Sequence, residues 1–319
     1  MTVPQAPTTV ILWVHPRSCS TMFEQSVLQR PKEFKVLHEP MGDAYYFGPE
    51  KVSNRFDDAK CSKDYAHFAD STFKKTWDNI IKHNSPSDPP RTFSKDMAQY
   101  IFAPTYSSAT SVPSFSSTPT TSDDDDNPTL IPTSTLLSPS TVHTFLIRTP
   151  TKAIPSYHRL CYPGAPTDFD YFDPEEAGYR EVRALFDFIK KAKGRTPLVL
   201  DSEDLLKSPE EVMKIWCKEV GVEFDKGMLQ WDEGVQEHFA KWPGWHESAQ
   251  ASTGMGKGLK DHHITPSNHA SGTDSPKPDH PQIVKDAIEA NIADYEYLKK
   301  FVVKHEMVED RLGGVERKE

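Results

Sequence analysis

Two short polar segments carry residue types that can hold the charged groups of a nucleotide. The first, residues 15–21, follows the apolar run 10–14 and leads into an apolar-periodic stretch that starts at Met22. This order predicts a strand, a tight turn and a helix N-terminus, where outward-pointing N–H groups and the helix dipole favour an anion. The segment therefore predicts a phosphate or sulfate site. Its candidate ligands are Arg17, Ser18, Cys19, Ser20 and Thr21.

The second segment places an arginine at the carboxyl end of another apolar strand. Residues 144–147 form that strand, Arg148 follows it, and Ser156 lies eight residues further along the chain. A helix starting near Pro150 would bring the serine hydroxyl back toward the arginine, which gives a clamp for a second phosphate. The two segments together suit a nucleotide with two distant anionic groups. The chain lacks the Gly-x-x-x-x-Gly-Lys-Ser/Thr motif, which argues against an ordinary ATP or GTP hydrolase.

The pair of segments resembles the motifs of the sulfotransferase superfamily. The donor of that family, 3′-phosphoadenosine 5′-phosphosulfate (PAPS), carries two such anionic groups. Residues 16–21 are similar to the family's 5′-phosphosulfate loop, and residues 148–156 to its 3′-phosphate motif with the Arg-to-Ser spacing intact. The resemblance covers about residues 9–245 and is strongest to a subgroup with a His-Glu-Pro strand end, here residues 38–40, and an aromatic stretch, here residues 42–48.

Alternating strand and helix patterns predict a three-layer α/β/α fold with a central parallel sheet and a P-loop-like turn. We expect one domain over residues 1–319. Residues 104–141 are rich in Ser, Thr and Pro and contain the acidic run 123–126, which predicts a disordered insertion, with a phosphorylated regulatory loop or a lid as functional alternatives. Residues 266–281 predict a surface loop.

The resemblance also suggests catalytic residues. Lys95 matches the lysine of the family's Lys-Thr-His strand, which assists the leaving phosphate, but Met97 stands where the histidine, often the base, would be. Related sulfotransferases use a carboxylate near the second strand end, so Glu39 is the first candidate base. His38 is the second and Asp96 the third. An ordinary structural role, such as pairing with a neighbouring cation, is the alternative for Glu39.

Other candidate groups are less specific. Trp242 and Trp245 lie where the family closes a loop over the nucleotide, so either could stack on an adenine or an acceptor ring or belong to the core. Arg17 and the helix N-terminus would lower the Cys19 thiol pKa, but this position matches a family glycine and favours a packed loop residue over a nucleophile. The adjacent histidines His262 and His263 have no third ligand at a recognisable metal-site spacing, so we predict no metal.

Composition restricts the partners. The 319-residue chain has 47 acidic and 37 basic side chains, a net charge of −10 and a pI of about 5.7. It therefore offers no basic field for nucleic acid or anionic lipid, and no stretch is apolar enough to span a membrane. Four widely spaced cysteines and the lack of a secretory segment predict a reducing, cytoplasmic setting. The sequence does not indicate an oligomeric state.

These observations predict a PAPS-dependent sulfotransferase that transfers a sulfuryl group to a hydroxyl or amine of a small-molecule acceptor, without a metal. The acceptor's identity is not encoded in any motif. Two alternatives stay open. The first is a nucleotide-binding protein of this fold without turnover, and the second is an enzyme using the same cleft for another reaction, such as a sulfation-assisted elimination or transfer from a different phosphorylated donor.

Overall fold

A single parallel sheet forms the centre of the molecule. The computed structural model describes residues 8–82, 89–118, 126–234, 237–255 and 279–303. In this part of the chain five strands are paired in the order β2-β3-β1-β4-β5, and every pairing is parallel. The predicted α/β fold with a central parallel sheet is therefore confirmed. The strands are β1 (Thr9–Val14), β2 (Phe34–His38), β3 (Arg91–Met97), β4 (Thr141–Ile147) and β5 (Leu198–Asp201).

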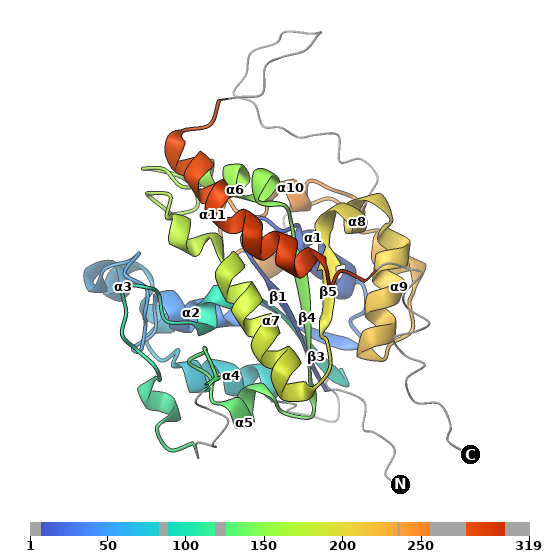
Figure 1. Ribbon diagram of the computed structural model, residues 1–319, viewed down its shortest axis with the longest axis horizontal. Coiled ribbons are helices and arrows are strands. Elements are labelled where there is room, and N and C mark those ends of the chain that lie inside the picture. The colour runs from blue at the N-terminus through green and yellow to red at the C-terminus, as the bar shows by residue number, and fades with distance from the viewer. Residues whose placement is uncertain (1–7, 83–88, 119–125, 235–236, 256–278, 304–319) are drawn as a thin grey trace.

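Helices connect successive strands and cover both faces of the sheet (Figure 1). Parallel neighbours need such crossovers because a tight hairpin can join only antiparallel strands. The α-helices of the described chain are α1 (Ser20–Leu28), α2 (Pro40–Tyr46), α3 (Asp58–Asp64), α4 (Phe73–Ile81), α5 (Thr133–Leu136), α6 (Pro150–His158), α7 (Tyr179–Lys193), α8 (Ser202–Lys207), α9 (Pro209–Val220), α10 (Glu247–Gln250) and α11 (Gln282–Lys299).

The apolar run of β1 supplies both layers of the core because successive side chains of a strand point to opposite faces. Ile11 and Trp13 pack in one cluster with side chains of α4, α7 and α11, whereas Leu12 packs in a second cluster with side chains of α1 and α9. All three side chains are fully buried. Figure 1 shows α7 and α11 crossing the same face of the sheet. The layering explains why residues 10–14 of this strand are all apolar.

The strand order reverses direction at the carboxyl ends of β1 and β4. The chain leaves β1 toward β2 on one side, whereas it leaves β4 toward β5 on the other, so the loops that follow β1 and β4 diverge. In the register of these two strands Val14 lies beside Leu146, which brings the start of the 15–19 loop next to Arg148. Open α/β sheets bind ligands at such a switch point, outside the carboxyl ends of the strands.

The predicted disordered insertion is wrong for the residues that the structure describes. On both sides of residues 119–125 the segment is folded, with a 3₁₀ turn η3 (Pro113–Phe115) and the helix α5. Phe115 and Ile131 are buried in the cluster that contains α4 and α7. Composition misled the prediction because a few large apolar residues spaced among Ser and Thr bury enough surface to order the segment.

The predicted loop at residues 266–281 and the assignment of one domain are not tested by the described residues. Residues 256–278 fall outside the described residues, so almost all of the predicted 266–281 loop does too. The assignment of residues 1–319 to one domain remains a prediction. Among the described helices, none has the length and hydropathy needed to cross a membrane.

Candidate functional site

The loop between β1 and α1, residues 15–19, has the backbone of an anion site and is called the anion loop. Arg17 and Cys19 both adopt left-handed conformations, with φ of +64° and +65°. Alternating left-handed residues turn successive N–H groups toward one side and form a concave nest for an anion. The loop leads directly into the N-terminus of α1, whose first N–H groups have no acceptor within the helix. Cys19 is the residue that precedes α1, and burial raises the pKa of its thiol, contrary to the expected lowering.

The two motif segments meet at the switch point. The Arg148 guanidinium donates a hydrogen bond from Nη1 to the Arg17 carbonyl oxygen at 3.0 Å, and the Arg148 N–H donates to Nε2 of His15 at 3.0 Å. Arg17 Nε in turn donates to the Ser156 hydroxyl at 3.0 Å. The structure therefore brings Arg17, Arg148 and Ser156 together, with Ser156 next to Arg17. Burial lowers the pKa of Arg17 to about 10, so this side chain stays positively charged at neutral pH.

Two atoms of these segments are buried without a hydrogen-bond partner among the described residues. They are the Ser18 hydroxyl oxygen and Arg148 Nε, whose nearest opposite charge is the Glu203 carboxylate at 4.0 Å. Buried polar groups are almost always hydrogen-bonded, since an unpaired one costs roughly 1–3 kcal/mol. A hydroxyl and a guanidinium N–H left unpaired beside an anion nest are the groups that a phosphate or sulfate would engage.

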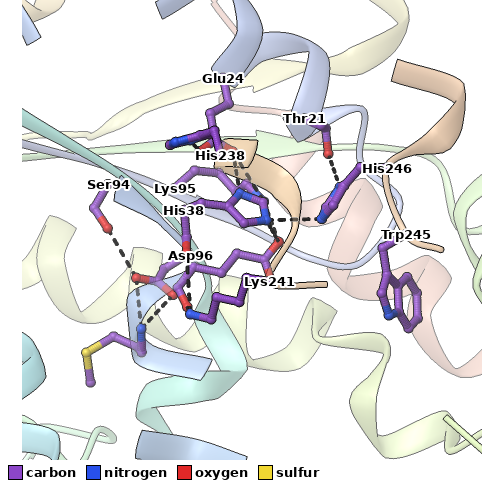
Figure 2. A network of polar contacts seen from close by, with 12 residues as sticks. Thr21, Glu24, His38, Ser94, Lys95, Asp96, His238, Lys241, Trp245 and His246 are labelled. Atoms are coloured by element: carbon purple, nitrogen blue, oxygen red, sulfur yellow. Dashed lines mark hydrogen bonds and ion pairs between the residues drawn. The ribbon is translucent and has the colours of Figure 1, made fainter. Parts of the chain in front are cut away.

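A buried acid–base cluster adjoins this loop (Figure 2). It contains Glu24 from α1, His38 at the end of β2, Glu39 directly after β2, and Lys95 from β3. The Lys95 ammonium is fully buried, forms an ion pair with Glu39 and lies 3.6 Å from Glu24 Oε2. Although burial opposes it, the Glu39 and Glu24 carboxylates raise the pKa of Lys95. Lys95 is therefore an ammonium at neutral pH that neutralises two buried carboxylates.

The three predicted candidates for the base have different surroundings. Glu39 has a left-handed backbone, with φ of +46°, accepts a hydrogen bond from the Tyr100 hydroxyl at 3.3 Å, and its pKa lies below the ordinary value because Lys95 outweighs the opposing effect of burial. Asp96 accepts hydrogen bonds from the Met41 N–H and the Ser94 hydroxyl, both at 3.2 Å, and burial raises its pKa. His38 bonds to Glu24 through Nδ1 at 2.9 Å.

A segment late in the chain closes over the cluster. This closing segment, residues 237–250, carries His238, Lys241, Trp245 and His246, which reach the cluster and the anion loop (Figure 2). Lys241 Nζ donates to the Glu39 carbonyl oxygen at 2.7 Å. The Trp245 carbonyl oxygen accepts a hydrogen bond from Arg17 Nη1 at 2.6 Å. The segment therefore ties the end of β2 to the β1–α1 loop.

The two tryptophans of the closing segment lie in different surroundings. Trp242 is buried against the aromatic side chains of α2, where a Cβ on Gly42 would come within 2.9 Å of its ring. The Trp245 ring stacks on Tyr157 with centroids 5.9 Å apart. Trp242 is thus a core residue, which was one of the alternatives. Trp245 packs on Tyr157, the residue that follows Ser156 in α6.

Two groups in the cluster have the donor types of a metal site. They are Glu24 with His38 and His238, and His38 with Glu39 and His246, whose donor atoms lie within 4.8 Å of one another. Each group contains a carboxylate that already faces the Lys95 ammonium. A divalent cation would have to sit beside that fixed positive charge, so we identify neither group as metal ligands.

Sequence reasoning missed Glu24, His238 and His246. Glu24 left a weak signal, because it interrupts the apolar side of α1 between Phe23 and Val27, where a charge needs a buried partner. The two histidines left none, since their partners in space lie far away in the sequence.

Comparison with known proteins supports the resemblance to sulfotransferases. A family model of the sulfotransferase domain matches residues 134–261, which include Arg148, Ser156 and the closing segment. The predicted resemblance to the sulfotransferase superfamily is confirmed by this match.

Two curated proteins of Arabidopsis thaliana also match. Branched-chain-amino-acid aminotransferase-like protein 2 is 27% identical over 114 residues, or 35% of this chain. Branched-chain-amino-acid aminotransferase-like protein 1 is 27% identical over 128 residues, or 40% of this chain. The matches span 19% and 21% of those two proteins, so this chain is similar to only about a fifth of each.

Solved structures of sulfotransferases are similar over most of the chain at low identity. The sulfotransferase domain from the curacin biosynthetic pathway aligns with 13% identity and a TM-score of 0.40, covering 97% of this chain and 98% of that one. The sulfotransferase domain of the Synechococcus PCC 7002 olefin synthase aligns with 15% identity and a TM-score of 0.42, covering 91% of this chain and 97% of that one. A sulfotransferase from Alicyclobacillus acidocaldarius gives 11% and 0.44, covering 93% and 96%.

Proposed function

We propose that this protein transfers the sulfuryl group of PAPS to a hydroxyl or amine of a small-molecule acceptor. The observation that carries the proposal is the meeting of Arg17, Ser18, Arg148 and Ser156 around a nest at the switch point of the sheet. This site combines two arginines with two hydroxyls, one of them unpaired. Such a set fits the two separate anionic groups of PAPS.

Each residue has a distinct part in the proposed donor site. Arg17, the hydroxyls of Ser18, Ser20 and Thr21 and the loop's N–H groups would hold the 5′-phosphosulfate, with Cys19 packed in the turn. Arg148 and Ser156 would hold the 3′-phosphate. The hydrogen bonds that Arg17 makes to Ser156 and to the Trp245 carbonyl would be exchanged for bonds to the donor, so the anion enters a site whose positive charges are already in place.

The reaction is an in-line displacement at sulfur. A bond forms between the acceptor oxygen or nitrogen and sulfur, while the bond from sulfur to the 5′-phosphate oxygen breaks and leaves adenosine 3′,5′-bisphosphate. Negative charge develops on the leaving oxygen, where Arg17 and the helix N-terminus stabilise it. The acceptor's proton passes to a base. We propose no metal in this step.

Among the three predicted bases, the geometry argues against both carboxylates and leaves His38 as the group that can take on positive charge. Glu39 is engaged through its two oxygens by the Lys95 ammonium and the Tyr100 hydroxyl. Asp96 has a raised pKa and its oxygens are occupied by Met41 and Ser94. The His38 ring instead has a carboxylate behind it, which would stabilise the positive charge it gains.

The second candidate is a nucleotide-binding protein without turnover. Met97 in place of the family histidine favours it, as does the engagement of Lys95 with two carboxylates. Calorimetry with adenosine 3′,5′-bisphosphate, against ATP and adenosine 5′-phosphate, tests the donor site that both candidates share. Release of adenosine 3′,5′-bisphosphate from PAPS, in the presence of phenols and primary amines, separates them. Tighter binding of ATP than of the bisphosphate would overturn both.

The subcellular location of the protein is also a proposal. All four cysteines are free thiols, as expected for a protein in a reducing compartment, and we propose the cytoplasm. The proposed partner is the small-molecule acceptor alone.

A further inference from the structure

A chain of four hydrogen bonds runs from Thr21 in the first turn of α1 through the acid–base cluster (Figure 2). The Thr21 hydroxyl bonds to His246 Nδ1 at 2.9 Å, and His246 Nε2 lies 3.0 Å from His38 Nε2. His38 Nδ1 lies 2.9 Å from Glu24 Oε2, and His238 Nε2 lies 2.7 Å from Glu24 Oε1. The chain therefore joins the first turn of α1 to the end of β2 through the closing segment.

The position of every proton in this chain follows from Glu24. Although burial opposes it, the Lys95 ammonium and the hydrogen bonds from His38 and His238 hold the pKa of Glu24 below its ordinary value, so Glu24 is an ionised acceptor. His38 must then donate from Nδ1, which leaves Nε2 without a hydrogen when the ring is neutral. His246 must donate from Nε2 to His38, which leaves its own Nδ1 as an acceptor. The Thr21 hydroxyl donates to that nitrogen.

We infer that His246 is the residue that takes the acceptor's proton, at Nδ1, with His38 and Glu24 as positioning residues behind it. The inference rests on the proposed sulfuryl transfer. Of the ring nitrogens in this hydrogen-bond chain, His246 Nδ1 is the one bonded to a residue of the proposed 5′-phosphosulfate site, Thr21. Both nitrogens of His38 are bonded inside the cluster, to Glu24 and His246, whereas His246 Nδ1 is bonded to a hydroxyl of the proposed donor site that can turn away and be replaced by the acceptor.

The acceptor's O–H or N–H bond breaks and its proton goes to His246 Nδ1, while the acceptor atom bonds to sulfur. The proton on His246 Nε2 passes to His38 Nε2, so the positive charge ends on His38, next to the Glu24 carboxylate. The buried carboxylate stabilises that charge and makes His246 a stronger base than an isolated buried imidazole. The Thr21 hydroxyl, which gives up Nδ1 to the acceptor, is free to bond to the donor.

The surroundings keep His246 neutral before the reaction. Burial lowers its pKa well below 6.5, and the positive groups Lys95 from β3 and Arg17 from the loop act in the same direction, as does His38, while Glu24 opposes them. The rate should therefore rise with pH through one apparent ionisation that belongs to the coupled His246–His38 pair and lies below 6.5. Above it the rate should be constant through neutral pH.

The tautomers can be tested without turnover. In the 319-residue chain at pH 7.5, ¹⁵N NMR of the histidine rings should show the proton on Nε2 in His246 and on Nδ1 in His38, with signals assigned from His246→Gln and His38→Gln. A proton on Nδ1 of His246 would overturn the inference, because that nitrogen could then accept nothing. This result is independent of whether PAPS is the donor, which calorimetry with adenosine 3′,5′-bisphosphate decides.

Turnover tests the role itself. With PAPS as donor and phenols or primary amines as acceptors, His246→Gln should lower kcat about 10²- to 10⁴-fold, with the bisphosphate Kd changed less than about threefold. The control His67→Gln, at an exposed position, should change neither kcat nor Kd. Glu24→Gln should also lower kcat and move the acid limb to lower pH, since the imidazolium loses its carboxylate. A purely structural role would leave that pH profile in place. Full activity of His246→Gln, or no turnover by an unmodified protein that binds the bisphosphate, would overturn the inference.

Discussion

Replacement of Lys95 by methionine is the sharpest test of the buried cluster. The side chain of Lys95 is fully buried, and so is that of Glu24, while Glu39 is 4% exposed. Methionine keeps most of the volume but removes the ammonium that both carboxylates share. Breaking a buried ion pair in this way costs roughly 3–5 kcal/mol, because an uncompensated charge stays in the interior.

The pH dependence of the loss identifies its cause. Glu24 keeps hydrogen bonds from His38 and His238, so Glu39 is the carboxylate that will take up a proton. At pH 7, protonating a carboxyl of ordinary pKa near 4.3 costs about 3.7 kcal/mol, and at pH 5 it costs about 1 kcal/mol. In the variant the folded-state pKa of Glu39 exceeds its unfolded value, so the destabilisation should be large at pH 7 and shrink as the pH falls.

Urea unfolding followed by circular dichroism and tryptophan fluorescence measures this loss at both pH values. Lys214→Met is the matched control, because Lys214 forms an i,i+4 pair with Glu210 on the surface and should cost less than about 0.5 kcal/mol. A Lys95→Met loss as small as the control, or a loss equal at pH 5 and pH 7, would refute the assignment of Lys95 as the counter-ion of Glu39 and Glu24.

Three further predictions concern the donor site, the corrected segment and acid stability. Arg148→Ala should weaken adenosine 3′,5′-bisphosphate by roughly 2–4 kcal/mol and Ser156→Ala by about 1 kcal/mol in calorimetry, with adenosine 5′-phosphate hardly affected; equal losses for both nucleotides would contradict the 3′-phosphate role. Ile131→Ala should lower the free energy of unfolding by about 2–4 kcal/mol and the exposed Ser116→Ala by less than about 0.5, whereas a disordered segment would make both neutral. His143 accepts from Trp13 and has its pKa lowered by burial to about 3, so its contribution to stability is complete above pH 6.5 and falls by about 1.4 kcal/mol per pH unit toward pH 3; a His143→Gln variant with the same slope in urea titrations would argue against it.

The fold could be predicted from the sequence because its signals are local. The run Val10 to Val14 is apolar at every position, as a strand buried on both faces requires, and the polar turn that follows has the residue types of an anion site. Arg148 at the end of a second such strand follows the same logic. The strands and the residue types of the two motifs therefore follow from patterns within about ten residues of each motif, whereas the register of β1 and β4 brings the two segments together.

The folding of residues 104–141, in contrast, could not be predicted from local sequence signals. Their average composition indicated disorder, yet Phe115 and Ile131 are buried because other parts of the chain supply the surface that covers them. A composition average cannot register such partners, since the free energy of burial depends on what lies opposite each side chain.

By itself the sequence determined the order of strands and helices, the anion loop and the resemblance to sulfotransferases, all of which depend on neighbouring residues. Only the tertiary structure decided how protons and charges are arranged beside that loop. Thr21 and His246 lie 225 positions apart, and His38 and His246 lie 208 apart. Whether Glu39 or a histidine can accept a proton depends on which buried cation or carboxylate lies within a few ångströms, because charges interact strongly only at short range in a protein interior. That distance is set by the packing of α1, β2, β3 and the closing segment and by no single stretch of the chain.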